Sequence, residues 1–97
     1  MKKTEYIPTP IEVTGTNLPP NFYELAEIIA ENVHEVWFKN RRNQGLTYGT
    51  ELNFIKKKTP CLRPYKEISN SEKLFDRETA FSTLLSITKF GYKIVKQ

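Results

Sequence analysis

The sequence predicts a mainly helical α+β fold, with two amphipathic helices packed together, short strands and an ordered proline-rich N-terminal arm. Three observations lead to this prediction: two long segments with apolar residues at helical spacing, a cluster of prolines near the start, and a loop-like region in between. The chain has 97 residues, of which 38% are hydrophobic and 27% are charged, as is ordinary for globular proteins. We therefore expect one domain over residues 1–97, with its core within about 6–96.

The arm is predicted from four prolines, Pro8, Pro10, Pro19 and Pro20. Proline lacks a backbone N–H and favours extended geometry in the residue before it, so this segment is an extended arm or a loose tail rather than a helix. Pro20 suits the first turn of a helix, and Asn21 is an acceptable N-cap.

A first helix is predicted from Phe22 to Gln44, followed by Gly45 as the C-terminal stop. Acidic residues dominate its first turns and basic residues its last turns, which complements the helix dipole at both ends. Its apolar stripe, at spacings of three and four residues, consists of Phe22, Leu25, Ile29, Val33, Val36 and Asn40.

A second helix begins with a capping box, in which Ser69 is followed three residues later by Glu72, and it ends at Gly91. Arg77 falls within its buried stripe, so the stem of this side chain must approach the core. The stripe consists of Leu74, Phe81, Leu84, Leu85 and Thr88. Residues 92–96 are predicted to form a short strand.

The connection between the helices, residues 46–68, reads as irregular with short extended pieces. Residues 47–49 resemble the end of a strand followed by a turn. Residues 59–65 must be extended because two prolines lie within them, and Leu62 and Tyr65 are expected to hold this run against the core.

Composition excludes several classes of protein. No apolar run approaches the roughly 20 residues of a bilayer span, so we expect no membrane partner. The start shows no secretory signal, and the single cysteine, Cys61, fits a reducing compartment, so we expect a cytoplasmic location. The net charge of +4 is mild, and the basic runs 39–42 and 56–58 are either solvated faces or a surface for a polyanion. Nucleic acid is the least favoured partner.

No constellation of catalytic residues is apparent. His34 is the only histidine, and together with Cys61 it supplies neither a general base with its partner nor the three or four ligands of a zinc site. No phosphate-loop, dinucleotide or nucleophile-elbow motif occurs. The sequence therefore predicts a protein that is not an enzyme and that needs no metal or cofactor.

Aromatic and cationic residues at boundary positions suggest a ligand site instead. Guanidinium groups bind phosphates or carboxylates in bidentate fashion, and Trp and Tyr offer flat faces to a purine. The alternative is internal packing, with Trp37 in the core and Arg77 paired with Glu72, Asp76 or Glu78. The candidate ligand-binding residues are Trp37, Arg41, Tyr48, Tyr65 and Arg77, with His34 and Asn32 as polar neighbours.

The order of short strings along the chain resembles the RyR domain, the repeat of ryanodine-receptor calcium channels that also occurs as single copies in bacterial proteins. The resemblance covers nearly the whole chain, and its specificity lies in the ordered set rather than in one string. The strings are Tyr6–Ile11, Leu18–Pro19, Ala30–Trp37, Arg41, Gln44–Gly45, Tyr48–Gly49, Pro60, Leu62, Pro64–Tyr65, Ser71–Lys73, Asp76–Arg77, Ala80 and Gly91–Tyr92. One departure is Leu46, at a position where the family usually has Trp, which removes an aromatic surface there.

The resemblance implies the helical α+β fold described above and a binding or sensor role. In the channels, paired repeats form a cytosolic module with a cleft for adenine nucleotides and small molecules, which makes a purine nucleotide or derivative the expected ligand class. A single copy can form a homodimer that imitates the pair. The alternative function is a protein-interaction or scaffold domain that acts through homodimerisation or partner binding.

Overall fold

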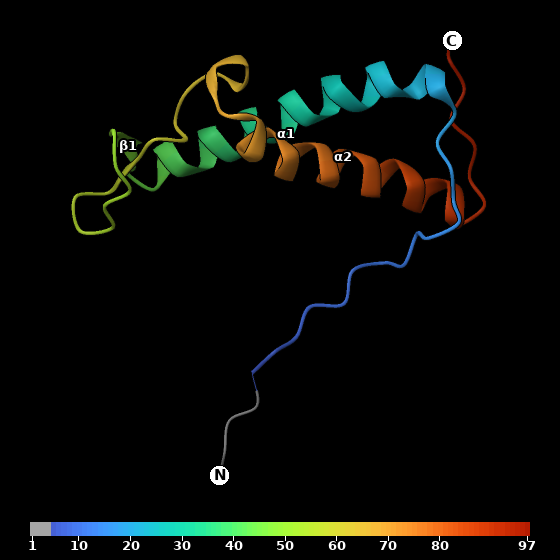
Figure 1. Ribbon diagram of the computed structural model, residues 1–97, viewed down its shortest axis with the longest axis horizontal. Helices are drawn as coiled ribbons and strands as arrows, with labels where there is room; N and C mark the ends of the chain where they lie inside the picture. Colours follow the sequence, from blue (N-terminus) through green and yellow to red (C-terminus); the bar gives the residue numbers. More distant parts are fainter. Residues whose placement is uncertain (1–4) are drawn as a thin grey trace.

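The computed structural model describes residues 5–97 and places two long antiparallel helices side by side (Figure 1). In chain order the elements are the 3-10 turn η1 (Pro20–Phe22), helix α1 (Tyr23–Asn43), strands β1 (Thr47–Tyr48) and β2 (Lys58–Thr59), the 3-10 turn η2 (Tyr65–Glu67) and helix α2 (Asn70–Lys89). The predicted mainly helical α+β class, with two helices packed together and short strands, is confirmed. Neither helix in this described part is both long and apolar enough to cross a membrane.

Both helices end at the predicted glycines. After α1, Gly45 has φ +90°, its N–H donates to the carbonyl of Arg42 at 2.9 Å, and the N–H of Leu46 donates to that of Arg41 at 3.0 Å. This Schellman arrangement needs the left-handed backbone that glycine adopts without strain. Gly91 repeats it after α2.

The start of α2 was predicted correctly, but the start of α1 was not. The capping box of α2 is confirmed, because the Ser69 hydroxyl accepts from the N–H of Glu72 and the Glu72 carboxylate accepts from the N–H of Ser69. The predicted cap at Asn21 is wrong. Pro20 opens a 3-10 turn there instead, and Phe22 occupies the N-cap of α1 without a side-chain hydrogen bond.

The seam between α1 and α2 is built from small residues. Ala30 and Ala80 are completely buried and share a cluster with Tyr65 and Ile68. A second cluster joins Leu18, Ala26 and Leu84, with Phe22, Leu25, Ile29, Phe81, Leu85 and Ile94 packed against it. Because alanine carries only a methyl group, the two backbones can approach closely along this seam.

Parts of the predicted apolar stripes are wrong. Val36 and Leu74 are each 53% exposed, and Asn40 and Thr88 are exposed as well. A helix turns about 100° per residue, so Val36 lies about 200° around α1 from the buried His34, and Leu74 lies about 120° around α2 from Ala80. The buried contacts involve the alanines and Leu84, whereas Val36 and Leu74 face away from them.

The connection between the helices contains a two-stranded parallel sheet, in which Thr47 pairs with Lys58 and Tyr48 with Thr59. Gly49 lies so close to β2 that a Cβ on it would stand 2.7 Å from the Cβ of Lys58. The predicted anchors Leu62 and Tyr65 are buried, which confirms that this part of the connection packs on the core.

The two ends of the described chain carry neither helix nor strand. Residues 5–17 run away from the helical pair, and Leu18 is the first buried residue (Figure 1). The strand predicted for residues 92–96 is wrong, because within residues 5–97 no strand pairs with this tail. Its Ile94 packs instead on the cluster around Ala26.

The seam predicts a strong dependence on side-chain size. The Ala80→Leu substitution is expected to lower the free energy of unfolding by about 1–3 kcal/mol, because no space exists for the larger side chain between the helices. The exposed neighbour gives the control: Glu78→Leu is expected to change it by less than about 0.5 kcal/mol. Urea unfolding followed by circular dichroism measures both, and equal effects would contradict the alanine seam.

Candidate functional site

Arg77, Glu27 and Tyr65 form a polar cluster across the two helices. The Arg77 guanidinium donates to both carboxylate oxygens of Glu27, at 2.8 and 3.0 Å, and the Tyr65 hydroxyl donates to the same carboxylate at 2.8 Å. The predicted approach of Arg77 to the core is thus real, but its partner is Glu27 of α1 rather than an acid of its own helix. The side chains of Arg77 and Glu27 are 38% and 46% exposed, so water screens their attraction.

The hydrogen bonds of this cluster shift the acidities of its members. The Arg77 hydrogen bond holds the pKa of Glu27 below its ordinary value, whereas burial works in the opposite direction. Burial, followed by the hydrogen bond to Glu27, raises the pKa of Tyr65 to about 12. At neutral pH the cluster therefore holds an ionised carboxylate, a guanidinium and a neutral phenol, and all three are engaged with one another.

His34, predicted as a polar neighbour of the ligand site, is buried between the helices and only 3% exposed. Its Nε2 lies 2.6 Å from the backbone oxygen of Arg63, and its Nδ1 lies 3.6 Å from Asp76 Oδ2. A carbonyl can only accept, so Nε2 carries a hydrogen. At 3.6 Å the contact between Nδ1 and Asp76 is longer than a hydrogen bond.

Asp76 is the acidic residue of this region whose pKa is raised. Burial raises the pKa of its carboxyl above the ordinary value, and the His34 imidazole acts in the opposite direction. Its side chain is 15% exposed and lies four residues before Ala80, next to the closest approach of the helices. Removal from water disfavours the charged form of a carboxylate, and a histidine at this distance compensates it only in part.

Three side chains of α1 stack along one face of the helix. The His34 ring and the Trp37 indole are stacked with centroids 5.5 Å apart, and the guanidinium of Arg41 lies 5.8 Å from the indole centroid. Two of the candidate ligand-binding residues, Trp37 and Arg41, are therefore in contact with each other. Arg41 is exposed and also donates to the Gln44 side chain at 2.9 Å, so its cation stays at the surface.

A hollow of about 280 Å³ opens beside this stack, and we call it the Trp37 hollow. Its aromatic walls come from opposite helices, and Phe75 on α2 is 73% exposed. The lining residues are His34, Trp37, Cys61, Ile68, Glu72, Phe75 and Asp76. Burial raises the pKa of the Cys61 thiol, so this thiol stays protonated and is a poor nucleophile. Within residues 5–97 no group of three or more His, Cys, Asp or Glu side chains is placed to hold a metal ion.

The predicted site residues do not all meet in this hollow. Arg77 is held by Glu27, which lies ten residues before Trp37 and hence about 15 Å away along α1. Tyr48 lies in β1, beyond the end of α1. Asn32 is exposed, about 200° around α1 from His34. His34, Trp37 and Arg41 are together, and Tyr65 links them to Arg77, with its ring 6.2 Å from that of His34.

Sequence reasoning missed that Phe75 and Asp76 line the Trp37 hollow. It also missed that Glu27 is the partner of Arg77. Phe75 lies outside the predicted apolar stripe of α2, so nothing in the sequence indicated that it belongs to a site. A usable signal was the position of Asp76 four residues before Ala80 and of Glu27 three residues before Ala30, because such spacings place polar groups on the same helix face as the alanines.

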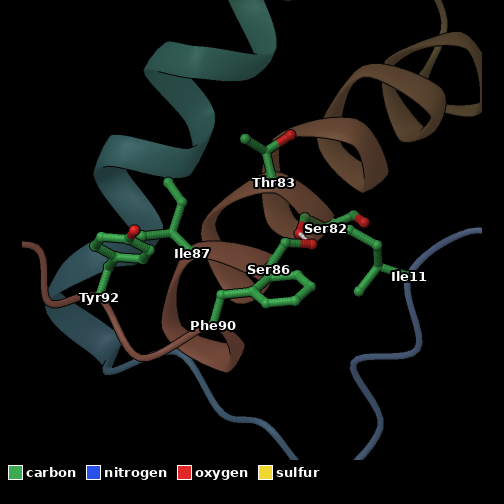
Figure 2. Close-up of a pocket in the computed structure, with 7 residues that line it drawn as sticks. All are labelled: Ile11, Ser82, Thr83, Ser86, Ile87, Phe90 and Tyr92. Atoms are coloured by element: carbon green, nitrogen blue, oxygen red, sulfur yellow. Dashed lines mark hydrogen bonds between the residues drawn. The ribbon is translucent and has the colours of Figure 1, made fainter.

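A larger hollow, of about 540 Å³, lies on the outer side of α2, and we call it the Phe90 groove. Figure 2 shows its lining, in which Ile11 of the arm faces the last turns of α2. The lining residues are Ile11, Ser82, Thr83, Ser86, Ile87, Phe90 and Tyr92, all apolar or hydroxyl-bearing. Without a charged group, this groove is poorly suited to an anionic ligand.

Comparison with protein-family models matches residues 6–96 to the RyR domain. The chain belongs to the RyR domain family. Three of the strings that carried the resemblance line the Trp37 hollow of this RyR domain: residues 30–37 supply His34 and Trp37, residues 71–73 supply Glu72, and residues 76–77 supply Asp76. Strings that are far apart in the sequence thus meet at this hollow.

The His34–Asp76 contact predicts an unusual pH dependence of stability. Because the folded state raises the pKa of Asp76, it binds more protons than the unfolded chain just above the ordinary value of 3.8, and stability falls as pH rises through that window. Asp76→Asn cannot titrate, and its amide donates to the bare Nδ1 of His34. We expect this variant to lack the decline and to equal or exceed the unmodified chain at neutral pH, by up to about 1.5 kcal/mol.

The measurement is urea unfolding between about pH 4 and about pH 8 for the unmodified chain, Asp76→Asn and Asp76→Ala. The alanine variant removes the charge without supplying a donor, so it separates the two effects. An Asp76→Asn variant that loses more stability at neutral pH than at acid pH would contradict the raised pKa of Asp76 as the cause.

Proposed function

We propose that this RyR domain is a non-catalytic binding module for a small molecule with a planar aromatic group, with purine nucleotides or their derivatives as the favoured class. In this proposal the Trp37 hollow is the binding site of that ligand. The observation that carries the proposal is the convergence of an indole, an exposed phenyl ring and a buried acid–imidazole pair between two helices, beside the surface cation of Arg41.

The size of the hollow limits what it holds. At about 280 Å³ it is at or below the small end of pockets for drug-sized ligands, which measure about 300–1,000 Å³. A single flat ring system is the part of a nucleotide that fits, and the sugar and phosphates then extend outward. Arg41, exposed at the outer face of the indole, is in reach of a group leaving the hollow in that direction.

Each proposed contact has a chemical counterpart in a purine nucleotide. Rings that stack on Trp37 or Phe75 contribute about 1–3 kcal/mol per base. The carboxylates of Glu72 and Asp76 accept hydrogen bonds from exocyclic amino groups, which purines carry. Arg41 donates to phosphate oxygens after it releases Gln44. Tyr65 and Arg77 act in support, because the Glu27 cluster fixes the relative position of the helices.

The proposal predicts a nucleotide-dependent change in the fluorescence of Trp37, the single tryptophan. Titration with adenine and guanine nucleotides is expected to change its emission. Arg41→Gln is expected to weaken the apparent affinity about tenfold through loss of one charge-assisted contact. Arg42→Gln gives the matched control, because it removes the same charge from the next residue, and it is expected to change the affinity by less than about twofold.

Two results would contradict the proposed site. One is an unchanged Trp37 emission together with unchanged amide NMR shifts in α1 and α2 at millimolar nucleotide. The other is an equal loss of affinity in Arg41→Gln and Arg42→Gln, which points to a diffuse charge effect rather than to a seat beside the indole.

A second candidate function, self-association as an interaction domain, is favoured by the amount of exposed surface. The chain has 8251 Å² of accessible surface, whereas a compact protein of 11.4 kDa has about 5,800 Å². The extended arm contributes part of this excess. A stable interface buries about 1,200–2,000 Å² in total, so a second copy of the chain seated on the Phe90 groove could cover the required area.

Light scattering coupled to size exclusion tests this candidate. We expect a concentration-dependent dimer that Phe90→Ser weakens at least tenfold, because this exposed ring lies in the groove. Phe54→Ser removes a ring of similar exposure far from the groove and is the control. A monomer at all concentrations, or equal weakening by both variants, counts against self-association through this surface.

A further inference from the structure

The loop between β1 and β2 has a closed turn at its end, whose residues 52–58 we call the lysine loop. Asn53 and Lys58 exchange both backbone hydrogen bonds, at 2.9 and 2.8 Å, and the Asn53 side chain accepts from the N–H of Lys56 at 3.0 Å. Lys57 has a left-handed backbone with φ +53°. The tip is therefore a defined turn and carries its side chains outward.

Large apolar side chains at that tip are exposed to solvent. Phe54 is 81% exposed and Ile55 is 95% exposed, and Leu52 beside them is exposed as well. Leu62, later in the same connection, is buried against the core. Two adjacent large apolar residues on a closed turn are unusual on a surface that only meets water.

Three lysines, residues 56–58, follow the apolar tip, and the amine of Lys58 donates to the Thr47 hydroxyl of β1 at 2.6 Å. Lys57 lies beside Gly45, where a Cβ would stand 3.7 Å from the Lys57 amine. This places the tip next to the basic end of α1, which carries Arg41 and Arg42. From the last turns of α1 to the start of β2, residues 39–58, the sequence has six basic residues and one acidic residue, Glu51, so this stretch is strongly basic.

We propose that the lysine loop docks on an anionic lipid bilayer, with Phe54 and Ile55 inserted at the level of the headgroups. Apolar side chains gain free energy on entering the interface, and lysines beside them contact anionic headgroups while their stems stay in the apolar layer. The expectation of no membrane partner rested on the absence of a spanning segment. A loop that inserts only two side chains needs no such segment.

The same observations favour a bilayer over other partners. Single-stranded nucleic acid would stack on Phe54 and pair with the lysines, but it offers no apolar layer to the aliphatic Ile55. A second copy would bring two clusters of lysines together, and like charges repel. Only an anionic surface with an apolar interior matches both the tip and the lysines that follow it.

Sedimentation with vesicles tests the proposal on the full chain. Vesicles with about 30% phosphatidylserine in phosphatidylcholine are compared with pure phosphatidylcholine. The Phe54→Ser/Ile55→Ser double variant is expected to bind the anionic vesicles at least tenfold more weakly. The matched control is Tyr6→Ser/Ile7→Ser, which removes an equally exposed aromatic and isoleucine pair from the arm, and it is expected to bind as the unmodified chain does.

Charge and depth are tested separately. Lys56→Gln/Lys57→Gln is expected to lose the preference for anionic over neutral vesicles. Phe54→Trp is expected to shift to shorter emission wavelength when anionic vesicles are added, because the new indole enters the interface. Melting temperatures close to that of the unmodified chain show that these surface variants fold.

Several outcomes would overturn the proposal. These are anionic-vesicle binding that survives Phe54→Ser/Ile55→Ser, equal loss in the arm control, and no emission shift in Phe54→Trp. Binding to short single-stranded DNA that needs the lysines but not Ile55 would assign the loop to nucleic acid instead.

Discussion

The close approach of α1 and α2 at Ala30 and Ala80 is the constraint on which the rest of the structure depends. Both residues are completely buried. His34 lies four residues after Ala30 and Asp76 four residues before Ala80, so the antiparallel arrangement brings these two side chains level with each other. The long side chain of Arg77 also reaches across to Glu27 of α1.

This geometry explains what sequence reasoning could and could not predict. Helix ends are local features, so Ser69, Gly45 and Gly91 were identified from their own neighbours. The partner of Arg77 was not, because it lies 50 residues away. Its neighbours Asp76 and Glu78 were weak candidates, since adjacent residues on a helix do not face each other. Only the packing of the two helices against each other brings Glu27 within reach of Arg77.

The apolar stripes were wrong in part. Counting large apolar residues correctly placed Leu84 in the core but also included Val36 and Leu74, which are exposed. The buried alanines, which such a count overlooks, mark the face of each helix that meets the other. Phe75 is exposed too, and its exposure beside Trp37 is what gives the Trp37 hollow a second aromatic wall. The residues that a stripe analysis misplaces are thus informative about the candidate site.

The three surfaces considered for binding all lie outside the alanine seam. The Trp37 hollow opens beside it, the Phe90 groove follows the outer face of α2, and the lysine loop extends beyond the end of α1. Changes at Phe90 or Phe54 therefore affect recognition without touching the contact that positions the helices. The Trp37 hollow differs, because His34 and Asp76 both line it and join the helices. A molecule bound there would contact side chains that also join the two helices, so its binding would stabilise the helical pair.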